Sequence, residues 1–314
     1  MGLVTRLKKT VLKDDRLRIE KTTAKNIPDF LHFTSERHLP IAQIFGDTSR
    51  VIFPSVQAYD MFKTFKKLDH SFLKDNNGVG IPLFRIRSVE WNQSNFKEKN
   101  KELVYQIFSY ELRTLSEVPP YMDGEIVLSN KEVNLYKCIY CDIYKANSSG
   151  GTTYFMEFKD DSLGEIPMIH RFQYRDMDTN IYNWNFRWHV KFSPIIENDH
   201  YKLGYLNPDT VSLLDAPKIV EDKKLLKVTK NQRFKLVFGH YTSEDSDFFP
   251  SSIIKVADFT IGEKEVVPSL GIRDVPVVTK IFSCQCLLIH IIELEKRSGE
   301  RAINAPYNTP FIMM

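Results

Sequence analysis

Residues 281–292 read IFSCQCLLIHII, and this stretch decides the fold. As a helix it carries apolar side chains on every face, and a helix that is apolar all round must be surrounded by other protein. Helix punctuation marks its ends, because Asp274 and Pro276 precede the run Val277–Lys296 and Gly299 follows it. The sequence therefore predicts a buried helix near the C-terminus, for which the rest of the chain must supply a container.

Strands supply that container. From residue 83 onward apolar and polar residues alternate with a period of two, which is typical of half-buried strands. Asn147–Gly151 is the clearest hairpin turn between two of these runs. Their succession predicts a mainly β fold with minor α content, an antiparallel β-barrel around the buried C-terminal helix. The predicted strands are Leu83–Arg87, Leu103–Leu112, Leu135–Tyr144, Thr152–Lys159, Ile169–Tyr174, Tyr182–Phe192, Tyr201–Leu206, Phe234–Phe238 and Ile253–Ile261.

The N-terminal part has a different pattern. Residues 55–73 carry apolar side chains at helical spacing, and Ser55 can cap them, so a helix is predicted there. Residues 1–25 are basic and amphipathic, which fits either a loose or edge-strand terminus or a polybasic segment at a membrane surface. We expect an N-terminal basic and helical segment packed on the barrel (1–79), the barrel with its central helix (80–299) and a C-terminal tail (300–314).

Composition bounds the function without naming it. The net charge of +3 and the pI near 8.5 permit an anionic partner, but they lack the strong basic excess of a dedicated nucleic-acid domain. A chain of 314 residues needs no disulfide staples, and no secretory signal opens it, so the four cysteines are expected to be reduced. No uninterrupted apolar run reaches the length of a membrane span. The expected location is cytoplasmic, which is compatible with a peripheral position at a membrane.

No motif for catalysis or metal binding passes a test of its spacing. Cys138 and Cys141 fall three apart in a predicted strand, and Cys284 and Cys286 two apart in a predicted helix, so neither pair shares a face. The segment 176–187 opens like a calcium loop but lacks the Gly and Glu that such a loop needs. Neither G-x-S-x-G nor H-E-x-x-H occurs. We predict no catalytic residue, no metal and no cofactor; an enzyme with a barrel-mouth pocket assembled from distant residues is the alternative.

Three aromatic segments add a resemblance to this order of elements. They are Phe172–Asp176 (FQYRD), Tyr182–Trp188 (YNWNFRW) and Tyr201–Leu206 (YKLGYL). Together with the barrel and the terminal helix, they make residues 80–299 resemble the tubby-like superfamily of tubby C-terminal domains, phospholipid scramblases and plant LURP-type proteins. The resemblance implies a binding module rather than an enzyme, in several members for phosphoinositides or other membrane lipids. Residues 1–80 have no counterpart in the minimal fold, and the signature segments of true tubby proteins are missing.

Basic residues supply the candidate contacts. Arg85 and Arg87 share one face of a predicted strand, Arg187 and Lys191 share a face of another, and a lysine-rich run lies further on. On a barrel wall such groups can hold a phosphoinositide headgroup or an acidic leaflet, at about 1 kcal/mol for each basic residue. The predicted lipid-headgroup contacts are Arg85, Arg87, Arg187, Lys191, Lys223, Lys224, Lys227 and Lys230.

We therefore predict a non-enzymatic intracellular binding or adaptor module whose partner is an anionic membrane lipid or a protein. A nucleic-acid-binding module is the second alternative after the enzyme, because aromatic and basic residues interleave in Tyr182–Lys191. The mild overall charge disfavours it. The sequence sets no oligomeric state.

Overall fold

Thirteen strands form one antiparallel sheet that closes on itself. The computed structural model describes residues 27–74, 77–89, 101–120, 124–148, 150–171, 175–190, 200–215, 234–244, 252–264 and 270–304. The strands are β1 (Ser35–Ile44), β2 (Arg50–Ile52), β3 (Phe84–Ser88), β4 (Glu102–Thr114), β5 (Glu125–Ser129), β6 (Val133–Ser148), β7 (Gly151–Phe158), β8 (Glu165–Arg171), β9 (Met177–Ile181), β10 (Trp184–Val190), β11 (His200–Leu206), β12 (Phe234–Ser243) and β13 (Ile253–Glu263).

The order of the sheet is β4-β3-β2-β1-β13-β12-β11-β10-β9-β8-β7-β6-β5. Strand β4 also pairs with β6, which closes twelve strands into a barrel and leaves β5 attached to the first half of β6. Closure removes the open sheet edges that would otherwise invite pairing with other chains. The predicted fold class, a mainly β antiparallel barrel with a C-terminal helix, is confirmed.

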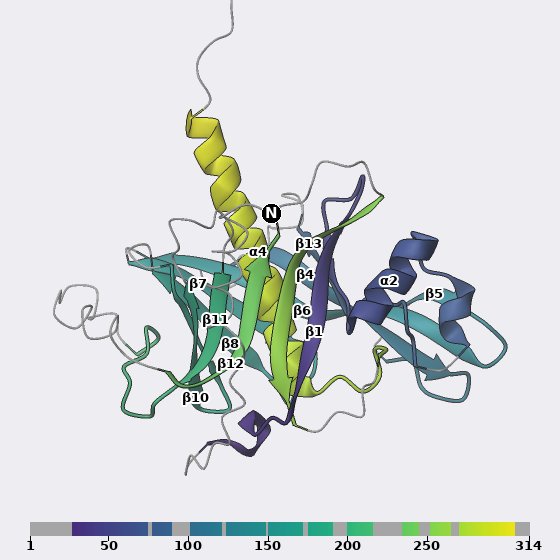
Figure 1. Cartoon of the computed structure of the whole chain (residues 1–314), viewed down its shortest axis with the longest axis horizontal. Coiled ribbons are helices and arrows are strands. Elements are labelled where there is room, and N and C mark those ends of the chain that lie inside the picture. Colours follow the sequence, from purple (N-terminus) through teal and green to yellow (C-terminus); the bar gives the residue numbers. More distant parts are fainter. Residues whose placement is uncertain are drawn as a thin grey trace, which may run out of the picture.

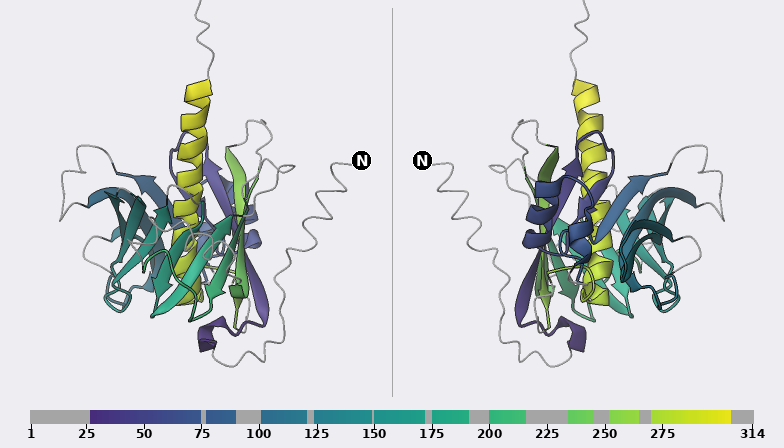
Figure 2. Two further views of the ribbon diagram at one scale, coloured as in Figure 1. Left: turned by 90° about the vertical axis from the view of Figure 1, so that its left-hand side faces the viewer. Right: turned by 90° about the vertical axis from the view of Figure 1, so that its right-hand side faces the viewer.

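Helix α4 (Val277–Asn304) runs through the barrel, and its C-terminal end projects beyond the strands (Figures 1 and 2). Its central residues Ile281, Phe282, Leu287 and Leu288 are fully buried against the inward side chains of the strands. By length and composition, residues Val277–Ser298 would also suit a membrane span, with a mean hydropathy of 1.7. However, 72% of that window is buried inside the protein, which is the environment of a core helix.

A side-chain amide joins the helix to the barrel wall. Trp188 on β10 donates its indole N–H to Gln285 Oε1 at 2.9 Å, and Gln285 Nε2 donates to Thr179 Oγ1 on β9, also at 2.9 Å. Thr179 in turn donates to the Pro167 carbonyl of β8 at 2.9 Å. Because Gln285, Thr179 and Trp188 are fully buried, each polar group depends on this chain of hydrogen bonds. The chain fixes the rotation and depth of α4 against three strands.

Two more polar contacts hold α4 where it leaves the barrel. Tyr241 of β12 lies 2.8 Å from His290 Nδ1, and Tyr201 of β11 donates to Glu293 Oε1 at 2.5 Å. Burial acts to raise the pKa of Glu293, but Lys296, Tyr201 and Arg175 outweigh it and the pKa is lowered. Glu293 is therefore a carboxylate held at the barrel mouth.

A second apolar cluster lies between the outer wall and helix α2 (Val56–Phe65), which Figure 1 shows beside β5. Ser55 caps α2 by accepting from the Ala58 N–H at 3.1 Å, as the sequence predicts. The predicted helix 55–73 is nevertheless two elements, because Lys66 adopts a left-handed conformation that ends α2. Asp69 then caps the 3-10 helix η2 (His70–Leu73). A short 3-10 helix, η1 (Asp29–Leu31), precedes β1.

The structure corrects three boundaries. The predicted barrel begins at residue 80, yet β1 and β2 from the predicted N-terminal segment are barrel strands, and β1 pairs along its length with β13. Pro40 and the polar residues before it hide β1 from a search for alternation. Between the predicted strands Ile169–Tyr174 and Tyr182–Phe192 the structure has a further strand, β9, whose polar residues bind Gln285 and a covering loop. Helix α4 also continues past Gly299 and ends before Pro306, which restricts the preceding residue.

Residues 1–26 and 305–314 carry the predicted basic N-terminal segment and most of the predicted tail. They lie outside the described residues.

We expect Gln285→Leu to lower the free energy of unfolding by about 1–3 kcal/mol, because it leaves the buried Trp188 N–H without an acceptor. Urea denaturation measures this. The double variant Trp188→Phe/Gln285→Leu removes both partners and should recover part of the loss. A single variant as stable as the parent would contradict the role given to this amide.

Burial, with Arg50 and Arg297 nearby, lowers the pKa of His290 to about 3. Below about pH 6.5 this histidine binds a proton in the unfolded chain but stays neutral in the folded chain. Its contribution to the free energy of unfolding is therefore fully present above about pH 6.5 and is lost as the pH decreases. The contribution of this residue is up to about 1.4 kcal/mol for each pH unit below that value. His290→Gln should flatten the dependence of unfolding free energy on pH, measured by urea titration at several pH values. The exposed His70→Gln is the control, and equal slopes for both variants would contradict the assignment.

Candidate functional site

The outer wall over β3, β4 and β6 carries a group of cations around one aromatic ring. Arg85 on β3 lies directly opposite Phe108 on β4, and Arg87 opposite Gln106, so all four side chains share the outer face. The Arg87 guanidinium lies 4.6 Å from the centroid of the Phe108 ring. The Lys137 ammonium of β6 lies 4.7 Å from the same centroid. We call Arg85, Arg87, Lys137 and Phe108 the basic cluster.

The cations of the basic cluster differ in how they are paired. Arg85 forms an ion pair with Asp47 and donates to Ser49 Oγ at 2.9 Å, so it is anchored to the turn before β2. Among the described residues, Arg87 donates only to the neutral amide oxygen of Gln106, at 3.2 Å, apart from its contact with the ring. In the described part of the chain, neither Arg87 nor Lys137 forms an ion pair with a carboxylate.

The positive charges of the basic cluster repel one another, which is seen in the pKa of Lys137. Burial lowers the pKa of Lys137, and repulsion from Arg85 and Arg87 lowers it further. Glu125 on β5, which lies opposite Lys137, raises this pKa but only in part offsets the lowering. Cations that repel one another are stabilised when an anion binds beside them. The cluster is thus arranged to accept negative charge.

Arg187 is not part of this surface, contrary to the sequence prediction. Its guanidinium makes two hydrogen bonds to Asp178, at 2.6 and 2.8 Å, and its side chain is 4% exposed. Asp178 also accepts from Ser212 Oγ at 3.1 Å and from the Leu213 N–H at 2.7 Å. Arg187 does lie on the outward face, as its position predicts, but the loop after β11 covers it. The ion pair with Asp178 raises the pKa of Arg187 against the effect of burial, so the arginine is a structural cation.

Of the other predicted lipid-headgroup contacts, two belong to the basic cluster and the rest lie outside the described residues. Arg85 and Arg87 lie on the same face of β3, as strand alternation predicts, and both belong to the basic cluster. Lys191, Lys223, Lys224, Lys227 and Lys230 lie outside the described residues.

Sequence reasoning missed Lys137 and Phe108. Lys137 belongs to the predicted strand Leu135–Tyr144, and alternation along that strand predicts its outward position. The sequence does not predict that β4 pairs with β6. This pairing places Lys137 opposite Tyr110 and thus beside Phe108. A register shift between Ile107 and Phe108 makes that alignment impossible to count from the sequence.

Two other kinds of site are not seen in the described residues. No group of three or more His, Cys, Asp or Glu that could hold a metal ion occurs there. Cys138, Cys141, Cys284 and Cys286 are free and buried, and burial raises the pKa of Cys141, Cys284 and Cys286 well above the usual thiol value. These are inert thiols of the core.

Comparison with known proteins gives a consistent family. A model of the DIA1 family matches residues 34–298. The protein DIA1 of Saccharomyces cerevisiae is 37% identical over 316 residues, which cover 96% of this chain and 93% of that protein. Two further proteins of the same yeast, both described only as uncharacterized, are 36% and 27% identical. They cover 89% and 86% of this chain and 93% and 72% of their own lengths. No solved structure matches the chain.

We expect Arg187→Ala to lower the free energy of unfolding by about 3–5 kcal/mol, because it leaves the carboxylate of Asp178 buried without its cation. The matched control, Arg113→Ala, breaks the partly exposed ion pair with Glu111 and should cost less than about 1 kcal/mol. Chemical denaturation distinguishes the two. A small loss at Arg187, with an unchanged affinity for anionic vesicles, would show that this arginine holds neither the fold nor a ligand.

Proposed function

The chain belongs to the DIA1 family, and we propose that it is a non-enzymatic binding or adaptor module of the cytoplasm that attaches to anionic membrane lipids, phosphoinositides among them. One observation carries the proposal: Arg87 and Lys137 converge on Phe108 beside Arg85, and no carboxylate among the described residues pairs with either of them. A headgroup phosphate would supply the missing negative charge.

The geometry of the basic cluster suits a phosphate group. Arg87 offers a planar set of donors that can bind two phosphate oxygens, and Lys137 adds a point charge from β6, on the other side of β4. The Phe108 ring, only 7% exposed, fixes both cations over its face and leaves their outer sides toward solvent. The contacts come from rigid strands rather than loops, so the binding geometry is formed before the ligand arrives.

The interior of the barrel supports a role on the outer wall. The lumen, where a barrel enzyme would hold its substrate, is filled by the packed side chains of α4 and the strands. The described residues that line a pocket on the outer wall, beside β8, β9 and β10, include neither histidine nor cysteine. A spatially assembled acid–base site at the barrel mouth was the alternative, and these features favour binding over it.

We also propose kinship with the tubby-like superfamily. A closed antiparallel barrel around a C-terminal apolar helix is the arrangement that the resemblance implies, and it supports a lipid-binding role of the same kind.

A salt titration of liposome pelleting tests the proposed function. The full chain should sediment with vesicles that contain phosphoinositide or phosphatidylserine at low salt and be released at high salt, because exposed charges are screened. Reversal of both unpaired cations in Arg87→Glu/Lys137→Glu should weaken binding by about 10- to 100-fold, at about 1 kcal/mol for each basic residue lost.

The control is Lys67→Glu/Lys264→Glu, which changes the net charge equally at two exposed positions away from the basic cluster. It should keep most of the binding. Equal losses in both double variants would mean that general charge, not the cluster, attracts the membrane. Absence of salt-sensitive binding to every vesicle composition would refute the lipid proposal and favour a protein partner.

A further inference from the structure

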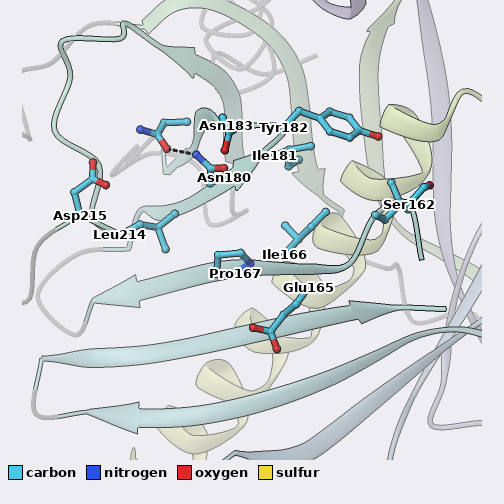
Figure 3. A pocket seen from close by; sticks show the side chains of 12 residues that line it. Ser162, Glu165, Ile166, Pro167, Asn180, Ile181, Tyr182, Asn183, Leu214 and Asp215 are labelled. Atoms are coloured by element: carbon cyan, nitrogen blue, oxygen red, sulfur yellow. Dashed lines mark hydrogen bonds between the residues drawn. The ribbon is translucent and has the colours of Figure 1, made fainter. Parts of the chain in front are cut away.

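A pocket of about 560 Å³ lies on the outer wall at the end of the β8, β9 and β10 strands, and Figure 3 shows it from close by. The loop before β8, the start of β8, the β9–β10 turn and the loop after β11 form its walls. The volume is that of a site for a small molecule. The lining includes Glu165, Asn180, Tyr182, Asn185, Leu214 and Asp215.

Two asparagines give the pocket a defined pattern of hydrogen-bonding groups. Asn180 Nδ2 donates to Asn185 Oδ1 at 2.7 Å across the β9–β10 pair. This bond leaves the oxygen of Asn180 and the NH₂ group of Asn185 directed to other partners. If both amides were turned over, one donor and one acceptor would still remain. The pair thus always presents a donor beside an acceptor, which matches a hydroxyl group because a hydroxyl both donates and accepts.

The charges that the structure describes around the pocket disfavour an anion. Among the described residues, the lining contains Glu165 and Asp215 but no lysine, arginine or histidine. Glu165 is neutralised by Lys101, whose ammonium lies 2.6 Å from it. Asp215 forms no ion pair in the described part of the chain and accepts only from the Ser212 N–H, at 3.3 Å. An anionic ligand would meet this carboxylate without a compensating cation, whereas hydroxyl groups can donate to it.

The rim holds an aromatic residue in a conformation that it rarely adopts. Tyr182 and Asn183 form the β9–β10 turn with φ angles of 52° and 64°. Asparagine tolerates this left-handed region, but a bulky residue such as tyrosine is strained there. The Tyr182 ring is half exposed, and its edge-on contact with Phe30 at 6.1 Å leaves much of it open. Strained residues that persist in a structure point to a use for the side chain.

The loop after β11, which forms the pocket wall opposite the β9–β10 turn, is anchored to the buried carboxylate of Asp178. Leu214 and Asp215, seen together at one side of Figure 3, follow directly on Ser212 and Leu213. Those two residues bind the buried carboxylate of Asp178, which Arg187 holds. The pocket is therefore formed by a clamped loop and by the paired strands β8, β9 and β10.

We propose that this pocket binds a neutral polyhydroxylated ligand, a sugar of one or two rings. The amide pair and Asp215 receive the hydroxyl groups, and the open face of Tyr182 packs against the apolar C–H face of the sugar ring. Phosphorylated sugars are excluded by the acidic lining. The pocket is separate from the basic cluster, so sugar binding can be tested independently of lipid binding.

Saturation-transfer difference NMR on the full chain tests this assignment. The probes are glucose, mannose, galactose, N-acetylglucosamine, trehalose and maltose, with glucose 6-phosphate and spermidine as charged counterparts. At least one neutral sugar should bind with a dissociation constant of about 1 mM or below, measured by calorimetry. Asn185→Ala should weaken that binding about tenfold, because Asn180 and the ligand both lose a partner. Gln57→Ala, which removes an exposed amide on α2, is the control and should leave it unchanged.

Tyr182→Gly separates binding from folding. Glycine adopts the left-handed turn without strain, so the thermal midpoint should not fall, while sugar binding weakens about tenfold with the loss of the ring. Failure of every neutral sugar to bind would overturn the proposal. So would equal binding by the Asn185→Ala variant, or a preference for glucose 6-phosphate or spermidine over the neutral sugars.

Discussion

The hydrogen-bonded amide of Gln285 is the contact on which the arrangement of helix and barrel depends. An apolar helix can slide and rotate inside an apolar tube at little cost, because dispersion and hydrophobic burial are not directional. The bonds from Gln285 to Trp188 and Thr179 are directional, and both partners are fully buried. Misplacing the helix by one residue would leave three buried polar groups unsatisfied, so a single registration is favoured.

Filling the barrel with its own helix moves any binding function to the outside. The outer wall carries two surfaces of opposite character on different strands. The basic cluster on β3, β4 and β6 collects cations around Phe108, whereas the pocket on β8, β9 and β10 collects amides and carboxylates. Both surfaces are built on paired strands, which are rigid. This rigidity keeps like charges close together in the basic cluster and holds the strained β9–β10 turn at the rim of the pocket.

Arg187 shows what strand alternation can predict about a side chain and what it cannot. Alternation predicts that Arg187 points outward, and an outward arginine beside aromatic residues is typical of a ligand contact. The structure shows a loop folded over it, with Asp178 bound from both sides by the arginine and by the loop. Its function is to hold that loop, which forms one wall of the pocket. Alternation gives the direction of a side chain but not what covers it, since the covering segment comes from a distant part of the chain.

By itself the sequence determined the class of fold and the central place of the C-terminal helix. A helix apolar on every face has no other stable environment in a chain of alternating strands, so Ile281–Ile292 and the strands after residue 83 were sufficient. The sequence also placed Arg85 and Arg87 on one face. Only the tertiary structure decided that β1 and β2 complete the barrel, that Lys137 joins those arginines, and that Asn180, Tyr182 and Asp215 surround one pocket. The physical reason is that alternation and helical spacing are local, whereas strand register, bulges and loop cover arise from contacts between residues far apart in the chain.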